Sequence, residues 1–137
     1  MRPPDDPELA SWVDKANEDL SAVEILRAQA PGLDSVIGFH CQQAAEKLLK
    51  AVFVALDRRP PRTHDLTALV AELIPLVPDL AGLSDIAAFL GGFAVLPRYP
   101  SIPDPDKDPA EVSRAAAEGA RGIDGAVRNV LGLPPRP

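Results

Sequence analysis

Hydrophobic residues recur at three- and four-residue intervals along most of the chain, which predicts amphipathic helices rather than strands. The first such run opens at Asp6-Pro7-Glu8, where an N-cap side chain, a proline and an acidic residue are together typical of a helix start. It ends at Pro31-Gly32. A second run begins at Asp34 or Ser35 and is expected to continue to about Arg59, before two prolines. Because only a short break separates these two long helices, they should lie antiparallel and side by side.

Two further helices are predicted in the middle of the chain. Thr63 or Asp65 caps a shorter one, which stops between Pro75 and Pro78. Another begins at about Ser84, and its apolar side carries Ile86, Phe89, Leu90 and Phe93. A pair of glycines weakens the end of this helix.

The last predicted helix follows a segment rich in proline. Residues 96–109 contain five prolines, which deny the backbone a regular hydrogen-bonding ladder and favour a loop or an extended arm. Asp108-Pro109-Ala110-Glu111 then repeats the helix-start pattern, and the helix ends before a glycine and two prolines. We therefore predict one all-α domain over residues 8–131, with terminal extensions at residues 1–7 and 132–137.

Composition narrows the class of protein. A chain of 137 residues, with 46% hydrophobic and 25% charged residues, fits one ordinary globular domain. A single cysteine excludes an internal disulfide and a multi-cysteine metal site. No apolar run is long enough for a bilayer, and the first residues lack a secretory-signal pattern, so we expect a cytoplasmic protein. The net charge of −6 disfavours broad binding to nucleic-acid phosphates but leaves room for a local basic site.

The second predicted helix contains a polar stretch, FHCQQAAEKLLKA, at residues 39–51. At about 100° per residue, one side of this helix is apolar and carries Cys41, which we expect to be a small buried residue. Gln42 falls within the apolar arc, where its amide needs hydrogen-bond partners. The opposite side carries His40, Gln43, Lys47 and Lys50. These four form either a solvated helix face or a stripe that binds a ligand or a partner subunit.

Basic residues gather between positions 40 and 64 of this acidic chain. The cations are Lys47, Lys50, Arg58, Arg59 and Arg62, against the carboxylates Glu46 and Asp57. Such a local positive charge suits a phosphate or an acidic partner. The alternative is that Arg58 and Arg59 only complement the negative end of a helix. His64 lies in Thr63-His64-Asp65, where we expect its imidazole to cap backbone groups of the next helix.

Together these motifs resemble the HEPN domain family, over residues from about 8 to 131. The matching motifs are Trp12, Asp19-Leu20, Phe39-His40, Gln42 to Lys47, Leu49-Lys50-Ala51, Thr63-His64-Asp65-Leu66 and Arg98-Tyr99-Pro100. The resemblance implies an up-and-down bundle of four long helices plus one short helix, usually paired as a homodimer. It also implies a neighbouring minimal nucleotidyltransferase as partner, often within a toxin–antitoxin pair. Some members of the family are metal-independent RNA endonucleases, whereas others bind nucleotides or are non-catalytic partners.

The chain departs from the nuclease members after Arg98. Those members have a histidine a few residues beyond the arginine, and RNA cleavage through its own 2′-hydroxyl needs a proton carrier and a cation. Here Pro-Asp-Pro, at residues 103–105, stands where that histidine would be, and both histidines of the sequence precede Arg98. Elsewhere, Arg58 and His64 have the nuclease spacing.

We therefore expect a non-catalytic HEPN-like protein that dimerises, pairs with a nucleotidyltransferase and binds a nucleotide, with no cofactor or metal. The candidate nucleotide- or partner-binding residues are His40, Gln43, Lys47, Lys50, Arg98 and Tyr99. Arg98 would contact a phosphate, and Tyr99 would stack on a base or accept a modifying group. The alternative is that both residues only anchor a loop. An RNA endonuclease toxin with a diverged site is the alternative function, and a helical interaction domain without a nucleotide role is a third.

Overall fold

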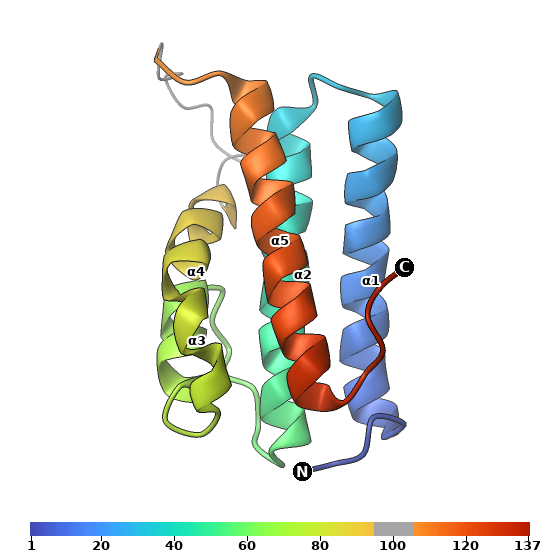
Figure 1. Cartoon of the computed structure of the whole chain (residues 1–137), viewed down its shortest axis with the longest axis vertical. Helices are drawn as coiled ribbons and strands as arrows, with labels where there is room; N and C mark the ends of the chain where they lie inside the picture. The colour runs from blue at the N-terminus through green and yellow to red at the C-terminus, as the bar shows by residue number, and fades with distance from the viewer. Residues whose placement is uncertain (95–105) are drawn as a thin grey trace.

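Three long helices run the length of the molecule in the computed structural model, which describes residues 1–94 and 106–137. These are α1 (Pro7–Gln29), α2 (Asp34–Ala55) and α5 (Pro109–Leu131). The shorter elements are α3 (Leu66–Leu73), the 3₁₀ turn η1 (Pro78–Leu83), α4 (Ser84–Gly91) and the 3₁₀ turn η2 (Gly92–Ala94). Figure 1 shows α1 on one side of the bundle, α3 and α4 on the other, and α2 and α5 between them.

The all-α fold class is confirmed, since the described part of the chain contains no strand. The described α-helices are three of 22 or 23 residues and two of eight residues. The resemblance implied four long helices and one short one. The fourth is short here because α4 reaches a pair of glycines at Gly91 and Gly92, and glycine is a poor helix former. None of the described helices is long and apolar enough to cross a membrane.

N-cap residues are predicted for four helices, and in three of them a predicted residue caps the helix. The side chain of Asp6 accepts a hydrogen bond from the Leu9 amide at 3.0 Å, and this bond holds the pKa of Asp6 below its usual value. Asp65 and Asp108 cap α3 and α5 in the same way. The prediction for α2 is wrong, because neither Asp34 nor Ser35 is its N-cap: that position is Leu33, without a side-chain cap.

Helix α2 also ends earlier than predicted. Its last residue is Ala55, whereas the two prolines at 60 and 61 suggested Arg59. The reason is Asp57, whose φ of 60° lies in the left-handed region and turns the chain out of the helix. The Arg58 amide then donates back to the Phe53 carbonyl at 2.9 Å. Residues 56–65 are therefore a connection that leads from the end of α2 to α3.

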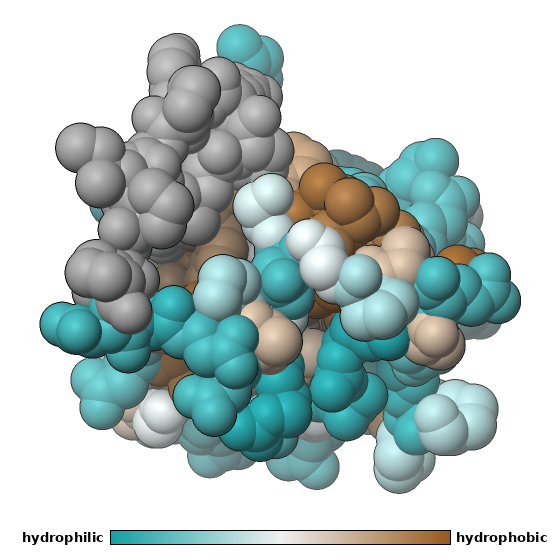
Figure 2. All heavy atoms as spheres, turned by 90° about the horizontal axis from the view of Figure 1, so that it is seen from above, coloured by the Kyte–Doolittle hydropathy of each residue, from teal (hydrophilic) through white to brown (hydrophobic). Residues whose placement is uncertain are grey.

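Helix α2 forms the centre of the core and packs against α1 on one side and α5 on the other. Cys41 is fully buried in it, as expected, and burial raises the pKa of its thiol to about 12. Gly38 allows the ring of Phe93 to lie directly on the α2 backbone, where a Cβ would overlap the ring. At the end where α1 meets α2, the surface is mostly hydrophilic around a hydrophobic patch (Figure 2), and Ile25 and Leu33 are exposed near this connection.

Both terminal segments lie against the bundle. The Arg2 amide donates to the Ala55 carbonyl at 2.7 Å, and the Arg2 guanidinium binds Asp57 at 2.7 Å. At the other end of the chain, Arg136 reaches α1 and donates to Asn17 at 3.1 Å. The N-terminal segment thus holds the end of α2, and the C-terminal segment crosses from α5 to α1 (Figure 1).

Candidate functional site

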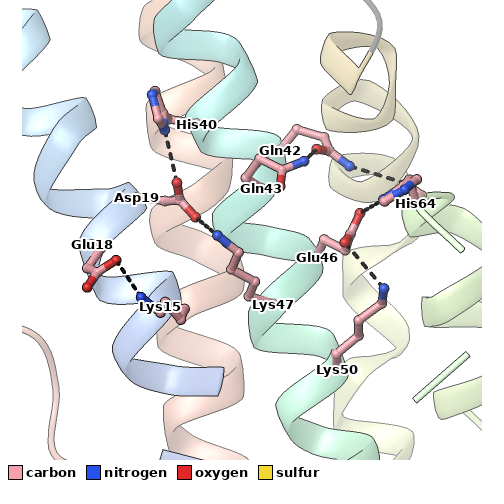
Figure 3. Close-up of polar contacts among 10 residues, drawn as sticks. All are labelled: Lys15, Glu18, Asp19, His40, Gln42, Gln43, Glu46, Lys47, Lys50 and His64. Atoms are coloured by element: carbon pink, nitrogen blue, oxygen red, sulfur yellow. Dashed lines mark hydrogen bonds and ion pairs between the residues drawn. The ribbon is translucent and has the colours of Figure 1, made fainter. Parts of the chain in front are cut away.

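The polar residues of α2 line one face of the bundle, between α1 and the connection that leads into α3 (Figure 3). We call this surface the polar face. Its members are Asp19, His40, Gln42, Gln43, Glu46, Lys47, Lys50 and His64. Two carboxylates organise it, one from α1 and one from α2 itself.

Asp19 of α1 holds the first half of the polar face. Its two oxygens lie 2.9 Å from Nδ1 of His40 and 2.6 Å from Nζ of Lys47. Because a carboxylate can only accept, the hydrogen of each contact comes from the imidazole or the ammonium. The Asp19 side chain is 11% exposed, and those of His40 and Lys47 are 30% and 25% exposed. The charge of Lys47 is therefore already balanced within the protein.

Glu46 holds the second half. Its oxygens lie 2.8 Å from Nδ1 of His64 and 3.3 Å from Nζ of Lys50. The Glu46 and Lys50 side chains are both buried, and Nζ of Lys50 lies 6.0 Å from the centre of the Trp12 ring. The His64 ring is 76% exposed, so its Nδ1 faces a buried carboxylate while most of the ring faces solvent. The carboxylate fixes the orientation of an imidazole that would otherwise rotate freely.

The two glutamines connect α2 to the segment before α3. Gln42 is fully buried in the apolar arc, as predicted, and its amide donates to the carbonyl of His64 at 3.2 Å. Gln43 donates to the Gln42 side-chain oxygen at 2.8 Å. No buried side-chain polar atom among the described residues lacks a partner. Gln42 and Glu46 together clamp the backbone and the ring of His64 onto α2.

These positions correct two expectations about the helix face. Lys50 does not lie on a solvated side, because Trp12 and Glu46 cover it. The imidazole of His64 does not cap α3: Asp65 does, and the ring pairs with Glu46 instead. The candidates His40, Gln43 and Lys47 are partly exposed and lie together, so their binding role stays a prediction. Arg98 and Tyr99 lie outside the described residues.

Asp19 belongs to a family motif of the sequence, but the helix pattern does not assign it to the polar face. It stands within the apolar stripe of α1, three positions after the buried Ala16 and next to the buried Leu20. An acidic residue at such a core-facing position needs a cationic partner, because an unpaired buried charge is costly. That spacing is the signal that could have paired Asp19 with a cation of α2.

The arginines that follow α2 lie apart from these ion pairs. Arg58 and Arg59 line a hollow of about 500 Å³, which we call the arginine hollow. Its other lining residues are Phe53, Pro61, Glu72, Pro75 and Leu76. The five cations predicted between residues 40 and 64 thus divide into two lysines that are paired, two arginines at a hollow, and Arg62, which is exposed and does not line the hollow.

A second hollow, of about 530 Å³, lies between α1 and α5 under the C-terminal segment. Its Arg128 is buried and engaged: it binds Asp124 at 2.9 Å, Asn17 at 2.8 Å and the Pro134 carbonyl at 3.1 Å. These bonds attach the C-terminal segment to the bundle. No group of three or more metal-binding side chains occurs within residues 1–94 and 106–137.

Comparison with known proteins gives one match. The family model of the HEPN domain matches residues 9–123, a span that includes α1 from its third residue, all of α2 to α4, and about two thirds of α5. No curated protein and no solved structure matches the chain. The matched span contains every residue of the polar face and of the arginine hollow.

Proposed function

Because the chain belongs to the HEPN domain family, we propose that it is a non-catalytic member that forms a homodimer and pairs with a minimal nucleotidyltransferase. In this proposal the pair is a toxin–antitoxin system, and the polar face contacts a nucleotide or the partner. His40, Gln43 and Lys47 make the contact, with Arg98 and Tyr99 as further candidates. Lys50 acts indirectly, by holding Glu46 in place.

The pairing of both histidines with buried carboxylates carries this proposal. Cleavage of RNA through its 2′-hydroxyl needs a mobile proton carrier next to an uncommitted cation. His40 and His64 are the two histidines of the sequence, and each holds a carboxylate that also binds a lysine. The lysine that shares a carboxylate with each imidazole is therefore committed to the fold, which favours association over cleavage.

The ordered side chains of the polar face support a binding role. His40 and Lys47 are partly exposed, yet Asp19 fixes both of them in one orientation. Gln43 is fixed by Gln42 and keeps its own side-chain oxygen for a further hydrogen bond. Side chains that are already immobilised lose little conformational entropy when a partner binds. A face of this kind suits a polar interface.

Light scattering of the purified chain, and of the chain co-expressed with a partner, tests the proposal. The purified chain should have the mass of a dimer at micromolar concentration, and co-expression with a neighbouring minimal nucleotidyltransferase should give a complex that survives gel filtration. Gln43→Ala with Lys47→Ala should weaken that complex without loss of helicity. A chain that stays monomeric and forms no complex with the transferase would exclude the proposal.

An RNA-cleavage assay with a chelator tests the alternative function. The proposal expects intact transcripts after incubation with the purified chain. Cleavage that persists in chelator and disappears in Arg98→Ala would instead identify an RNA endonuclease toxin.

A further inference from the structure

Arg58 and Arg59 are cations without a carboxylate. Neither guanidinium makes a hydrogen bond or an ion pair with any part of the chain that the structure describes, and both are exposed. The adjacent carboxylate, Asp57, is occupied by Arg2, which donates to the same oxygen from Nε at 3.1 Å and from a terminal nitrogen at 2.7 Å. The same guanidinium also binds Glu8 at 2.8 Å. The N-terminal segment therefore engages the acid next to the arginine hollow, while both arginines keep no partner among the described residues.

The end of α2 does not need these side chains as caps. Arginines near a helix terminus commonly bind its last carbonyls. Here backbone amides occupy all of them: Leu56 binds the Val52 carbonyl at 3.0 Å, Arg58 that of Phe53 at 2.9 Å, Asp57 that of Val54 at 2.9 Å and Arg2 that of Ala55 at 2.7 Å. The negative end of the helix is satisfied, so a capping role does not account for the two guanidinium groups.

The arginine hollow combines positive charge with an apolar wall. Its volume of about 500 Å³ is in the range of small-molecule sites. Glu72 is the acidic residue that lines it, against Arg58 and Arg59, so the lining has an excess of positive charge although the whole chain carries −6. Leu76 is 39% exposed there, and two prolines complete the apolar side.

We propose that the arginine hollow binds a phosphate monoester that carries a flat ring, such as a nucleoside monophosphate. The planar fork of a guanidinium matches phosphate oxygens, and two arginines balance a dianionic phosphate. One face of the ring packs against Leu76, and Glu72 accepts a hydrogen bond from a hydroxyl or amino group of the ligand. This inference extends the nucleotide-binding part of the proposed function to residues outside the polar face, so the two can fail separately.

Isothermal titration with adenosine monophosphate, adenosine and inorganic phosphate tests the proposal. Adenosine monophosphate should bind more tightly than either of its parts. Arg58→Ala with Arg59→Ala should weaken its binding at least about tenfold, the scale of losing charge-assisted hydrogen bonds. The affinity of Arg58→Lys with Arg59→Lys should lie between those of the wild type and the alanine variant, because lysine keeps the charge but lacks the planar fork of the guanidinium. Circular dichroism should show the same helicity for all variants.

The matched control is Arg27→Ala with Arg121→Ala. These two arginines also make no hydrogen bond or ion pair with the described residues, and their removal changes the net charge by the same amount. Arg27 stands on α1 and Arg121 on α5 at the second hollow, and neither lines the arginine hollow. An equal loss of binding in this control would mean a general charge effect and would overturn the proposal.

Four other outcomes would also overturn it. Wild-type protein could fail to bind adenosine monophosphate, or bind adenosine equally well, or bind a single-stranded oligonucleotide or an acidic peptide through the arginines instead. Binding that survives Arg58→Ala with Arg59→Ala and disappears in Gln43→Ala with Lys47→Ala would place the nucleotide on the polar face. In that case the arginine hollow is excluded and the proposed function stands.

Discussion

The polar face and the arginine hollow contain similar numbers of cations and differ in what those cations contact. Lys47 and Lys50 each bind a carboxylate that is almost fully buried, at 2.6 and 3.3 Å. Arg58 and Arg59 follow only a few residues later and bind no carboxylate of the described residues. Positive charge in a sequence is thus a poor guide to charge that is available to a ligand, because the fold commits some of it to holding helices together.

The difference also separates stability from function. A buried ion pair is weak support for stability in itself, but removal of one partner leaves an uncompensated charge in a poorly solvated place. An exposed, unpaired arginine contributes little to folding. Substitutions on the polar face should therefore be measured first as changes in unfolding free energy, and substitutions in the arginine hollow as changes in binding.

The largest effect is expected for Glu46→Ala. This change leaves Lys50 buried beneath Trp12 without a counter-charge and frees the ring of His64. We expect a loss of about 3 kcal/mol in the free energy of unfolding, measured by urea denaturation. Glu46→Leu combined with Lys50→Leu should recover most of the loss, because it removes both charges and keeps the volume. A single variant as stable as the wild type would mean that the ion pair is not committed to the fold.

The alkylation rate of Cys41 gives a local measure of the stability lost in Glu46→Ala. Burial raises the pKa of its thiol to about 12, so the folded thiol stays protonated and unreactive at pH 8, and alkylation follows opening of the core. Glu46→Ala should speed alkylation on the order of a hundredfold, the equivalent of about 3 kcal/mol. Arg58→Ala with Arg59→Ala should leave the rate unchanged.

The Cys41 thiol also makes stability depend on pH in the alkaline range. The unfolded thiol ionises near its ordinary value of 9.0, and the folded thiol only near about 12. Its contribution to stability is fully present below pH 9 and is lost progressively as the pH rises toward 12. In Cys41→Ala this alkaline loss should be smaller, which denaturation at pH 8 and pH 10.5 would show. An identical loss in both proteins would contradict the burial of an ionisable thiol.

A smaller effect is expected for Asp19→Asn. The amide can still accept a hydrogen bond from Lys47 or His40 but no longer balances the charge, so we expect a loss of about 1–2 kcal/mol. The matched control is Asp14→Asn, on the same helix, where the carboxylate is exposed and makes no hydrogen bond or ion pair with the described residues. Equal stability of the two variants would mean that the first half of the polar face is a solvated surface, as the plain helix projection suggested.

The sequence predicted local features well and long-range partners poorly, and the same two regions show why. Capping at Asp6, Asp65 and Asp108 depends on residues two or three positions away, so the local pattern contains the information. Projection of one helix correctly grouped His40, Gln43 and Lys47. It could not show that Asp19, 21 and 28 residues earlier, binds two of them, because that contact depends on how α1 packs on α2.

The end of α2 illustrates the same limit for the arginine hollow. Prolines at 60 and 61 predict a helix end near Arg59, but the left-handed residue is Asp57, a position that the sequence pattern does not mark. Aspartate tolerates this conformation better than most residues, and Arg2, near the N-terminus, stabilises it. The pattern therefore predicts Arg58 and Arg59 within the last turn of a helix, whereas they line a hollow beyond it.

The smallest effect on folding should come from Arg58→Ala with Arg59→Ala. Because neither side chain has a partner in the described residues, the free energy of unfolding should change by less than about 0.5 kcal/mol. Asp57→Ala is the informative companion, since it loses the Arg2 bonds and places alanine at a positive φ. If the arginine pair destabilised the protein as much as Asp57→Ala does, the arginines would be part of the helix terminus. Arg58 and Arg59 would then be committed to the fold like Lys47 and Lys50, and the contrast between the two regions would not hold.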